Sequence, residues 1–425
     1  MNKLLFFLLF IFLFSSCKDK KTTLTDENIQ IVSESSAIEE FVEDMEEFAA
    51  IPIYSSTSNY NNNLSAVAID VDFIQLDFDP PLGEFFFLNN VELSEEYIFL
   101  SWLYDIFAYD KTGKFIRKIG SRGQGPEEFV NIASIQLERE KKLLYAEDIG
   151  RRRMAVYRFD GSFEKSFPLK TGVYCVLLDS STFAWRQGVS ERRLNPSLVI
   201  RFSAENGEDL KTYWSNHFPL NTRTQKLGPD TSPLWNYNNT FFYMEWGTDT
   251  IFRILGDSLI PARVLTGDLK MMLIEHFAEN TGSKLKISTP IGQRNSGIFE
   301  SNQLMIFRLS NDYERFFMVY DKKTKQLHRT YHKDAPTTRL GDKLMDYFID
   351  DMFTGLPVNP LYQSMGKAIA FVPAHEIYAQ KQAILDFIEK NNHEKSAYLK
   401  QIVQNITDDD NPLMVIGNYS ASFIS

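Results

Sequence analysis

The sequence has almost no cysteine and no long hydrophobic run. Its 425 residues contain two cysteines, Cys17 and Cys175, so a framework of several disulfides is excluded. The longest uninterrupted apolar run, Leu4 to Phe14, has 11 residues, whereas a membrane-spanning helix needs about 20. A transmembrane helix is therefore not expected, and a folded domain must be held together by its hydrophobic core.

Positive charge is also scarce. Lysine and arginine number 45 against 56 aspartates and glutamates, which gives a formal net charge of −11. Because surfaces that bind the phosphate backbone are basic, a nucleic-acid partner is not expected. Hydrophobic residues make up 44% of the chain and aromatic residues 14%, enough for a large core. Cys175 lies in the apolar run V-Y-C-V-L-L and is predicted to be a small buried residue of that core.

The sequence lacks the short motifs of common catalytic and metal sites. It contains no G-x-S-x-G, no H-E-x-x-H and no G-x-x-x-x-G-K, which excludes the usual nucleophile elbow, zinc helix and P-loop. His328 and His332 are four residues apart on a strand-like run, a separation of about 13 Å at the rise of a strand and too large for one metal ion. We therefore predict no catalytic residue, no metal site and no cofactor.

The N-terminus has the pattern of a secretory signal. A basic start, M-N-K, is followed by the apolar run and then by S-S-C, an order typical of signal peptides. The cysteine after Ser15 and Ser16 resembles a bacterial lipobox, which implies a signal peptide at residues 1–16, cleavage before Cys17 and lipidation of its thiol. The alternatives are an ordinary secretory signal and a short anchor helix. The resemblance implies an outer-membrane lipoprotein, and the following K-D-K-K leaves both the periplasmic face and the cell surface open.

Residues 17–64 are predicted to be a polar tether. They end in S-S-T-S-N-Y-N-N-N, a composition that cannot bury a core. Apolar residues from Ile38 to Ala49 follow helical spacing with acids between them, and Ser36 with Glu39 forms a capping box, so a short acidic helix is expected. This helix is interpreted as a spacer docked on its own domain, with a partner site as the alternative.

From residue 65 the sequence repeats a unit of strands and turns. In the two clearest units a strand ending in Asp110 or Asp160 is followed by a glycine turn and another strand, which is a hairpin signal. Looser copies follow at 197–214, 250–265 and 316–331, and a sixth unit is assembled from 346–352, 367–372 and 412–419. Repeats of about 40–50 residues with several strands each are typical of propeller blades.

These units predict an all-β fold for residues 65–425, a six-bladed β-propeller with four-stranded antiparallel blades. Residues 67–78 are expected to supply the fourth strand of the last blade, so that N- and C-terminal strands close the ring and remove its exposed edges. Seven blades are the alternative. Within the last blade, residues 373–406 show two helical faces with a break at Asn391 and Asn392, and predict a helical hairpin insertion packed across one rim.

A glycine-rich stretch, K-I-G-S-R-G-Q-G-P-E-E-F, runs from Lys118 to Phe129 between the first two units. It is interpreted as a link between blades, where glycines allow positive φ and close backbone approach. A phosphate cradle is the weaker interpretation, because no helix start follows and Glu127 and Glu128 would repel a phosphate.

This stretch resembles the G-x-x-G-x-G-P-x-E-[FY] segment of the six-bladed β-propeller lipoproteins of Bacteroidota, relatives of NHL-type propellers. Residues 249–262, D-T-I-F-R-I-L-G-D-S-L-I-P-A, and 408–419, D-D-D-N-P-L-M-V-I-G-N-Y, are similar to the family's fourth-blade hairpin and closing strand. The resemblance covers residues 65 to 420. It implies a propeller fold and an envelope address, and it implies no activity.

The candidate ligand-binding residues are Arg122 and Gln124, from the glycine-rich stretch, and Arg152, from an unusual run of three arginines. Solvated turn charges paired with Glu147 and Asp148 are the alternative for that run. Five tryptophans are interpreted as core rather than as sugar-binding faces. The predicted function is a binding or scaffold module anchored in the envelope, with a glycan, a peptide or an envelope protein as the partner. The alternative is a propeller enzyme, an NHL-type lyase or a glycan-acting hydrolase or lyase, with its site at the axial mouth.

Overall fold

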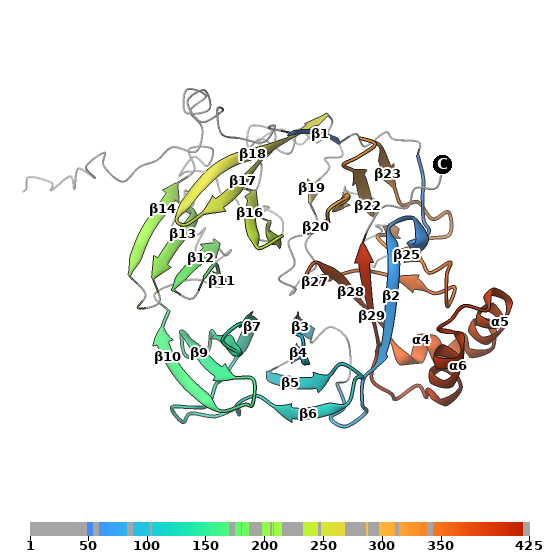
Figure 1. Cartoon of the computed structure of the whole chain (residues 1–425), viewed down its shortest axis with the longest axis horizontal. Helices are drawn as coiled ribbons and strands as arrows, with labels where there is room; N and C mark the ends of the chain where they lie inside the picture. The colour runs from blue at the N-terminus through green and yellow to red at the C-terminus, as the bar shows by residue number, and fades with distance from the viewer. Residues whose placement is uncertain are drawn as a thin grey trace, which may run out of the picture. The chain divides into compact units, whose positions relative to one another are not determined.

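The computed structural model gives six blades of antiparallel strands arranged in a ring (Figure 1), so the predicted fold class is confirmed. All described residues belong to one compact unit, residues 31–425. The structure describes residues 49–53, 59–82, 88–102, 104–169, 175–179, 181–186, 198–204, 206, 208–214, 233–244, 248–267, 286–287, 297–310, 314–337 and 343–419. The predicted signal peptide, Cys17, residues 38–48 of the predicted acidic helix and Trp246 lie outside these residues. Ala49, predicted to end that helix, begins a strand instead.

The blades follow one another along the chain. Blade 1 contains β3 (Leu88–Leu93), β4 (Tyr97–Trp102), β5 (Asp105–Asp110) and β6 (Phe115–Lys118). Blade 2 contains β7 (Ile132–Glu138), β8 (Leu143–Asp148), β9 (Arg153–Arg158) and β10 (Phe163–Pro168). Blade 3 contains β11 (Cys175–Leu177), β12 (Thr182–Arg186), β13 (Leu198–Ala204) and β14 (Asp209–Trp214). In each of these blades the first strand is innermost and the last is outermost.

Blades 4 and 5 carry additional strands. Blade 4 contains β15 (Leu234–Tyr237), β16 (Thr240–Met244), β17 (Thr250–Leu255) and β18 (Ser258–Gly267), with β1 (Ala49–Ile53) added outside β18. Blade 5 contains β20 (Ile298–Glu300), β21 (Leu304–Ser310), β22 (Glu314–Asp321) and β23 (Leu327–Arg329). Two short strands also join blade 5, β19 (Lys286–Ile287) beside β21 and β24 (Lys343–Met345) parallel to β22.

Blade 6 closes the ring with both ends of the chain. It contains β27 (Tyr362–Ser364), β28 (Lys367–Val372), β29 (Leu413–Tyr419) and, outermost, β2 (Ala68–Gln75). The prediction that residues 67–78 supply the fourth strand is therefore confirmed. The prediction that residues 346–352 supply another strand of this blade is wrong. They contain β25 (Phe348–Ile349), which pairs with β26 (Pro357–Val358) in a separate hairpin. The Asp350 carboxylate accepts the backbone N–H groups of residues 352–354 and so closes a tight turn directly after β25.

The repeated aspartates form the turns that the sequence predicts. Asp110 Oδ1 accepts hydrogen bonds from the backbone N–H of Thr112 at 2.8 Å and of Lys114 at 3.1 Å. Asp160 Oδ1 accepts the backbone N–H of Ser162 at 2.9 Å. The adjacent glycines, at positions 113 and 161, both have φ of +91°, a conformation that a side chain would strain. These turns are local, which explains why the sequence predicts them.

The segment before β2 runs along the outer edges of blades 4 and 5. Strand β1 pairs in parallel with β18 and buries Ile51 and Ile53 in the core. Asn62 exchanges hydrogen bonds with the backbone of Tyr331, and its carbonyl accepts the N–H of Ile349 at 2.7 Å. The 3-10 turn η3 (Leu64–Ala66) then leads into β2. Residues 49–53 and 59–63, within the stretch predicted to be a tether, thus cover sheet edges that would otherwise be unpaired.

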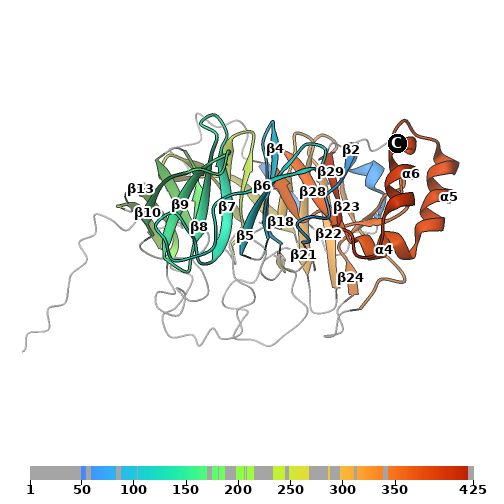
Figure 2. The ribbon, with the colours of Figure 1, turned by 90° about the horizontal axis from the view of Figure 1, so that it is seen from below.

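Three helices lie between β28 and β29, on the outer side of blade 6 (Figures 1 and 2). They are α4 (Ala374–Ala379), α5 (Lys381–Asn391) and α6 (Ser396–Asn405). The predicted break falls at Asn392, whose φ of +41° ends α5. Their apolar faces pack into the same cluster as Val71 and Phe73 of β2. Lys395 Nζ adds ion pairs to Asp70 at 3.1 Å and Asp72 at 2.8 Å, so the insertion fastens the closing strand.

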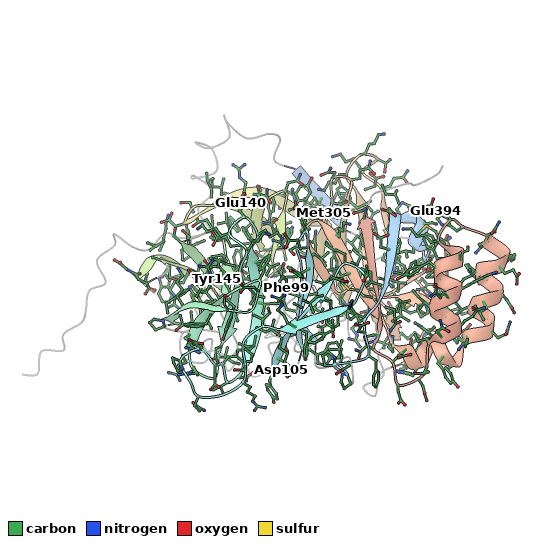
Figure 3. The ribbon with its side chains drawn as sticks, turned by 60° about the horizontal axis from the view of Figure 1, so that its bottom comes forward. Phe99, Asp105, Glu140, Tyr145, Met305 and Glu394 are labelled. Carbon is green, nitrogen blue, oxygen red and sulfur yellow. The ribbon has the colours of Figure 1, made fainter. Side chains whose placement is uncertain are left out.

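The described hydrophobic core consists of clusters between neighbouring blades. Phe99 of blade 1 packs into a cluster with residues of blade 2, Tyr145 into one shared with blade 3, and Met305 into one shared by blades 4 and 5. Figure 3 labels these side chains among the strands, together with Glu140 and Glu394, which are exposed. Cys175 is buried, as predicted, and forms no disulfide with the other described residues. Among the described tryptophans, those at 102, 185 and 235 are buried in these clusters, which supports their interpretation as core.

Candidate functional site

The antiparallel order of the strands places the links between blades at one end of the ring. The turn between β4 and β5, the turn between β8 and β9, and the link from β6 to β7 all lie at this end. We call it the loop face. This end carries Arg122 and Gln124, in the link, and Arg152, in the β8–β9 turn. The candidate ligand-binding residues therefore belong to neighbouring blades, 1 and 2.

The link from β6 to β7 is closed by its own hydrogen bonds. Gly123 N–H donates to the carbonyl of Phe129 at 2.9 Å, and Phe129 N–H donates to the carbonyl of Ser121 at 2.9 Å. The buried Phe129 and Tyr157 rings pack edge to face under the loop, with centroids 6.3 Å apart. Gly120 has φ of +66° and lies against both rings. The loop is consequently a rigid platform on the core of blade 2.

The expectation that Gly123 and Gly125 need positive φ is wrong, because only Gly120 of the three has it. Gly123 is required for close approach instead. A Cβ built on it would lie 2.0 Å from Oε2 of Glu128. That same oxygen accepts the N–H of Gly125 at 2.6 Å. The loop thus has one feature of an anion cradle, a backbone N–H presented to an oxyanion, but its own Glu128 occupies the position.

The run of arginines fastens the β8–β9 turn to this loop. Arg151 Nη1 donates to the carbonyls of Gly125 and Glu128, and Arg153 Nη1 donates to the carbonyl of Pro126 at 2.7 Å. Buried Asp148 faces Arg153 Nε at 3.6 Å. Two of the three arginines are therefore structural, and the prediction of charges paired with Asp148 holds for Arg153.

The side chains that remain exposed on the loop face of blades 1 and 2 include two arginines. Arg122, Gln124 and Arg152 are exposed. The Arg122 guanidinium lies 4.5 Å from the centroid of the Tyr104 ring, on the β4–β5 turn. We call these four residues, Tyr104, Arg122, Gln124 and Arg152, the arginine patch. Within the described part of the chain, Arg122 and Arg152 have no carboxylate within ion-pair distance, so their charge faces solvent.

Sequence reasoning missed Tyr104 and the internal role of Glu128. Tyr104 lies in a turn, and 18 residues separate it from Arg122 in the sequence. Nothing in a single sequence signals that contact. Glu128 could have been suspected, since a carboxylate three residues after Gly125 can fold back onto its N–H as side chains near turns commonly do.

A second polar centre lies at the opposite end, where blades 4, 5 and 6 meet. The buried carboxylate of Glu300 accepts Arg263 Nη1 at 2.9 Å, Lys322 Nζ at 2.6 Å and Trp235 Nε1 at 2.9 Å. Arg263 Nη2 also lies 2.8 Å from Oε1, so the pair is bidentate. Burial raises the pKa of the Glu300 carboxyl, but the charges of Arg263 and Lys322 outweigh burial, and the net pKa lies below the ordinary value. This carboxylate stays ionised and is unsuited to proton transfer.

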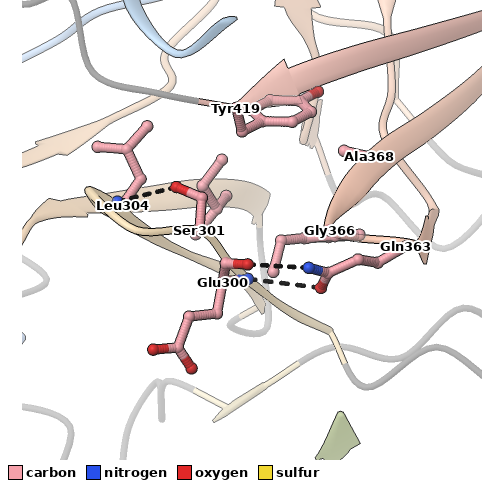
Figure 4. Close-up of a pocket in the computed structure, with 9 residues that line it drawn as sticks. Glu300, Ser301, Leu304, Gln363, Gly366, Ala368 and Tyr419 are labelled. Carbon is pink, nitrogen blue, oxygen red and sulfur yellow. Dashed lines mark hydrogen bonds between the residues drawn. The ribbon is translucent and has the colours of Figure 1, made fainter. Parts of the chain in front are cut away.

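The hollow beside Glu300 is too small for an organic ligand. Gln363 of blade 6 donates to the Glu300 carbonyl at 2.9 Å and lies across from Tyr419 (Figure 4). The Glu300 side chain points away from the hollow in this view. The cavity amounts to about 10 Å³, room for one water molecule. We interpret the whole centre as a structural junction between blades.

None of the described histidines is on an innermost strand of a blade. His328 is on β23, the outermost antiparallel strand of blade 5, and His332 stacks on Tyr347 with centroids 3.8 Å apart. His375 lies in α4 and His393 between α5 and α6. Within the described ranges, no three His, Cys, Asp or Glu side chains come together as a metal ion would require. Among the same residues, no helix is both long and apolar enough to cross a membrane.

Comparisons with known proteins agree with this architecture. A family model described as a domain of unknown function (DUF4934) matches residues 48–418. The chain is similar to the solved structure of a Bacteroides fragilis protein described as exported, with 14% identity, coverage of 88% of this chain and 100% of that chain, and a TM-score of 0.60. A DUF4221 family member from Bacteroides vulgatus has 11% identity, coverage of 84% and 98%, and a TM-score of 0.45. No curated protein matches the sequence. The first likeness shows the propeller fold.

Proposed function

We propose that this chain, which belongs to the family described as a domain of unknown function (DUF4934), is a ligand- or protein-binding module of the bacterial envelope. The observation that carries the proposal is the arginine patch. Its loop and turn are fastened to each other by Arg151 and Arg153, so the exposed side chains are held on a rigid support. Little conformational entropy is then lost when a partner binds.

The chemistry of the patch favours an acidic partner. Guanidinium groups bind carboxylates and phosphates through charge-assisted hydrogen bonds. The ring of Tyr104 offers an apolar face with a polar tip, a surface that suits sugars and peptides. On a chain with a net charge of −11, a local basic site also steers an anionic partner to one place. An acidic glycan or an acidic segment of an envelope protein fits this combination.

The double variant Arg122→Ala and Arg152→Ala is expected to weaken binding of acidic glycans or acidic peptides at least about tenfold, the loss that corresponds to one or two charge-assisted hydrogen bonds. Its thermal stability should match that of the wild type, since both side chains are exposed. Binding is measured on an array of acidic and neutral glycans and peptides, with Arg253→Ala as the control for losing an exposed arginine. Equal binding by the double variant and the wild type would show that the arginine patch is not the binding site.

We also propose that the module is anchored by lipidated Cys17 in the outer membrane, on its periplasmic face or at the cell surface. The S-S-C sequence at residues 15–17 supports this address. Cys17→Ala should shift the protein from the membrane fraction to the soluble fraction of lysed cells. Protease shaving of intact cells separates the two faces. Unchanged membrane fractionation of Cys17→Ala would contradict lipid anchoring.

A further inference from the structure

Blade 5 contains a buried arginine whose hydrogen-bonding capacity is only partly used. The side chain of Arg308, on β21, is 6% exposed and that of its partner Asp346 is 4% exposed. Arg308 Nε donates to Oδ2 of Asp346 at 2.6 Å, and Nη2 contacts the same oxygen. Its remaining nitrogen, Nη1, is buried and has no hydrogen-bond acceptor among the described residues.

A second arginine lies beside it on the same face of the sheet. The register of β21 and β22 pairs Arg308 with Phe317 and Ser310 with Arg315. Since paired residues share a face and every second residue along a strand returns to it, Arg308 and Arg315 are diagonal neighbours. Arg315 Nε is also buried without an acceptor in the described part of the chain.

These arginines lie on the face of blade 5 that packs against blade 6. Leu304, Ile306 and Phe317, on the same face, pack in the cluster shared with β28. Burial raises the pKa of Tyr362, and the positive charge of Arg308 opposes that rise, which places the guanidinium near β27. The Tyr362 hydroxyl in turn donates to the carbonyl of Leu88 at 3.0 Å. Because β21 ends at the loop face, Arg308 lies toward that end of blade 5.

Among the described residues, the positive charges of this cluster exceed the negative charge. Asp346 is the one carboxylate in the described ranges that pairs with either guanidinium, and each guanidinium has a buried nitrogen without an acceptor there. Burying an unsatisfied charged donor is costly, and native proteins normally supply the missing acceptor as a protein group, an ordered water or a ligand. An acceptor that also carries negative charge satisfies both the hydrogen bonds and the excess charge.

We propose that Arg308 and Arg315 form a binding site for one oxyanion group, a carboxylate or a phosphate, of a ligand that reaches the contact between blades 5 and 6 from the loop face. Asp346 positions Arg308, and the ligand oxygen bridges Nη1 of Arg308 and Nε of Arg315. This site is separate from the arginine patch of blades 1 and 2, so either site can fail in experiment without the other.

The test uses the full chain at constant ionic strength, with chloride replaced by inorganic phosphate or by acetate. The midpoint of thermal unfolding should rise by at least about 1–2 °C in one of these anions at 10 mM, as mass action requires for binding with a dissociation constant of about 1 mM. The rise should be retained in Arg253→Gln, a matched change at an exposed arginine. It should be lost in Arg315→Gln, with affinity at least about tenfold weaker. A rise in phosphate alone indicates a phosphate ligand, and a rise in acetate indicates a carboxylate.

Two results overturn the proposal. One is a wild-type midpoint that is the same in chloride, phosphate and acetate. The other is an equal rise in the wild type and Arg315→Gln. A crystal structure grown with the stabilising anion supplies an independent measurement, because the proposal requires an oxyanion between Arg308 and Arg315, and a water molecule in that place refutes it.

Discussion

Glu300→Gln is expected to lower the free energy of unfolding by about 3–5 kcal/mol, the usual cost of removing one partner from a buried ion pair. The substitution keeps the shape of the side chain but leaves the partly buried Arg263 and Lys322 against a neutral amide. Since these residues join blades 4 and 5, and Gln363 ties the Glu300 backbone to blade 6, the loss should appear as a lower midpoint of unfolding by heat or denaturant. Glu140→Gln, at the exposed position labelled in Figure 3, is the matched control, with an expected change within about 0.5 kcal/mol.

The same carboxylate predicts how stability depends on pH. The pKa of Glu300 is lower in the folded chain than in the unfolded chain, because Arg263 and Lys322 outweigh the effect of burial. Its contribution is therefore fully present above the unfolded-state pKa of about 4.3 and is lost as the pH falls through the folded-state pKa. Below about pH 4.5 the wild type should lose stability more steeply than Glu300→Gln. Parallel curves for the two proteins would show that folding does not lower the pKa of this carboxyl.

Gly120→Ala is expected to cost about 2–4 kcal/mol of stability, from backbone strain together with overpacking. Its φ is +66°, and an added Cβ would lie 2.8 Å from the Tyr157 ring and 2.9 Å from the Phe129 ring. Both rings are buried, so neither can move aside freely. The loss is measured as the change in the free energy of unfolding in denaturant.

Substitutions at two other glycines separate backbone strain from overpacking as causes of the lost stability. Gly256 has φ of +60° but nothing within 4 Å of an added Cβ, so Gly256→Ala should show backbone strain alone, about 1 kcal/mol. Gly123→Ala collides only with the flexible end of Glu128, and should cost about 1 kcal/mol through the lost hydrogen bond to Gly125. If Gly120→Ala cost no more than Gly256→Ala, the close packing of the loop on the two rings would not matter for stability.

The candidate site could be predicted from the sequence only in part. The glycine-rich stretch and the run of arginines are visible as unusual local compositions, and the structure places both on the loop face of neighbouring blades. Their roles depend on contacts across 18 to 30 residues of sequence, such as Arg122 with Tyr104 and Tyr157 with the carbonyl of Glu127. The cluster of Arg308, Arg315 and Asp346 gave no signal, because isolated charges on strands are ordinary in sequence and become informative only when the register and burial are known.

The sequence by itself determined the units of this fold. In each hairpin the turn aspartate accepts hydrogen bonds from residues two to four positions away, as at Asp110 and Asp160. The residues that form the turn are therefore neighbours in the sequence. The helical insertion has its own period and its own break at Asn392. The closing strand, β2, could be inferred because an open ring would leave two sheet edges unpaired.

Only the tertiary structure decided how the units join. In blade 6, β27 takes the place that was predicted for residues 346–352. Residues 49–53 pair with blade 4, and the Glu128 carboxylate occupies the loop at Gly123. The contacts responsible connect distant parts of the chain. Ser364 accepts the N–H of Leu93 from 271 residues away, and Gln363 binds the backbone of Glu300 from 63 residues away. Such pairs are selected by the packing of whole blades, which no local pattern of residues records.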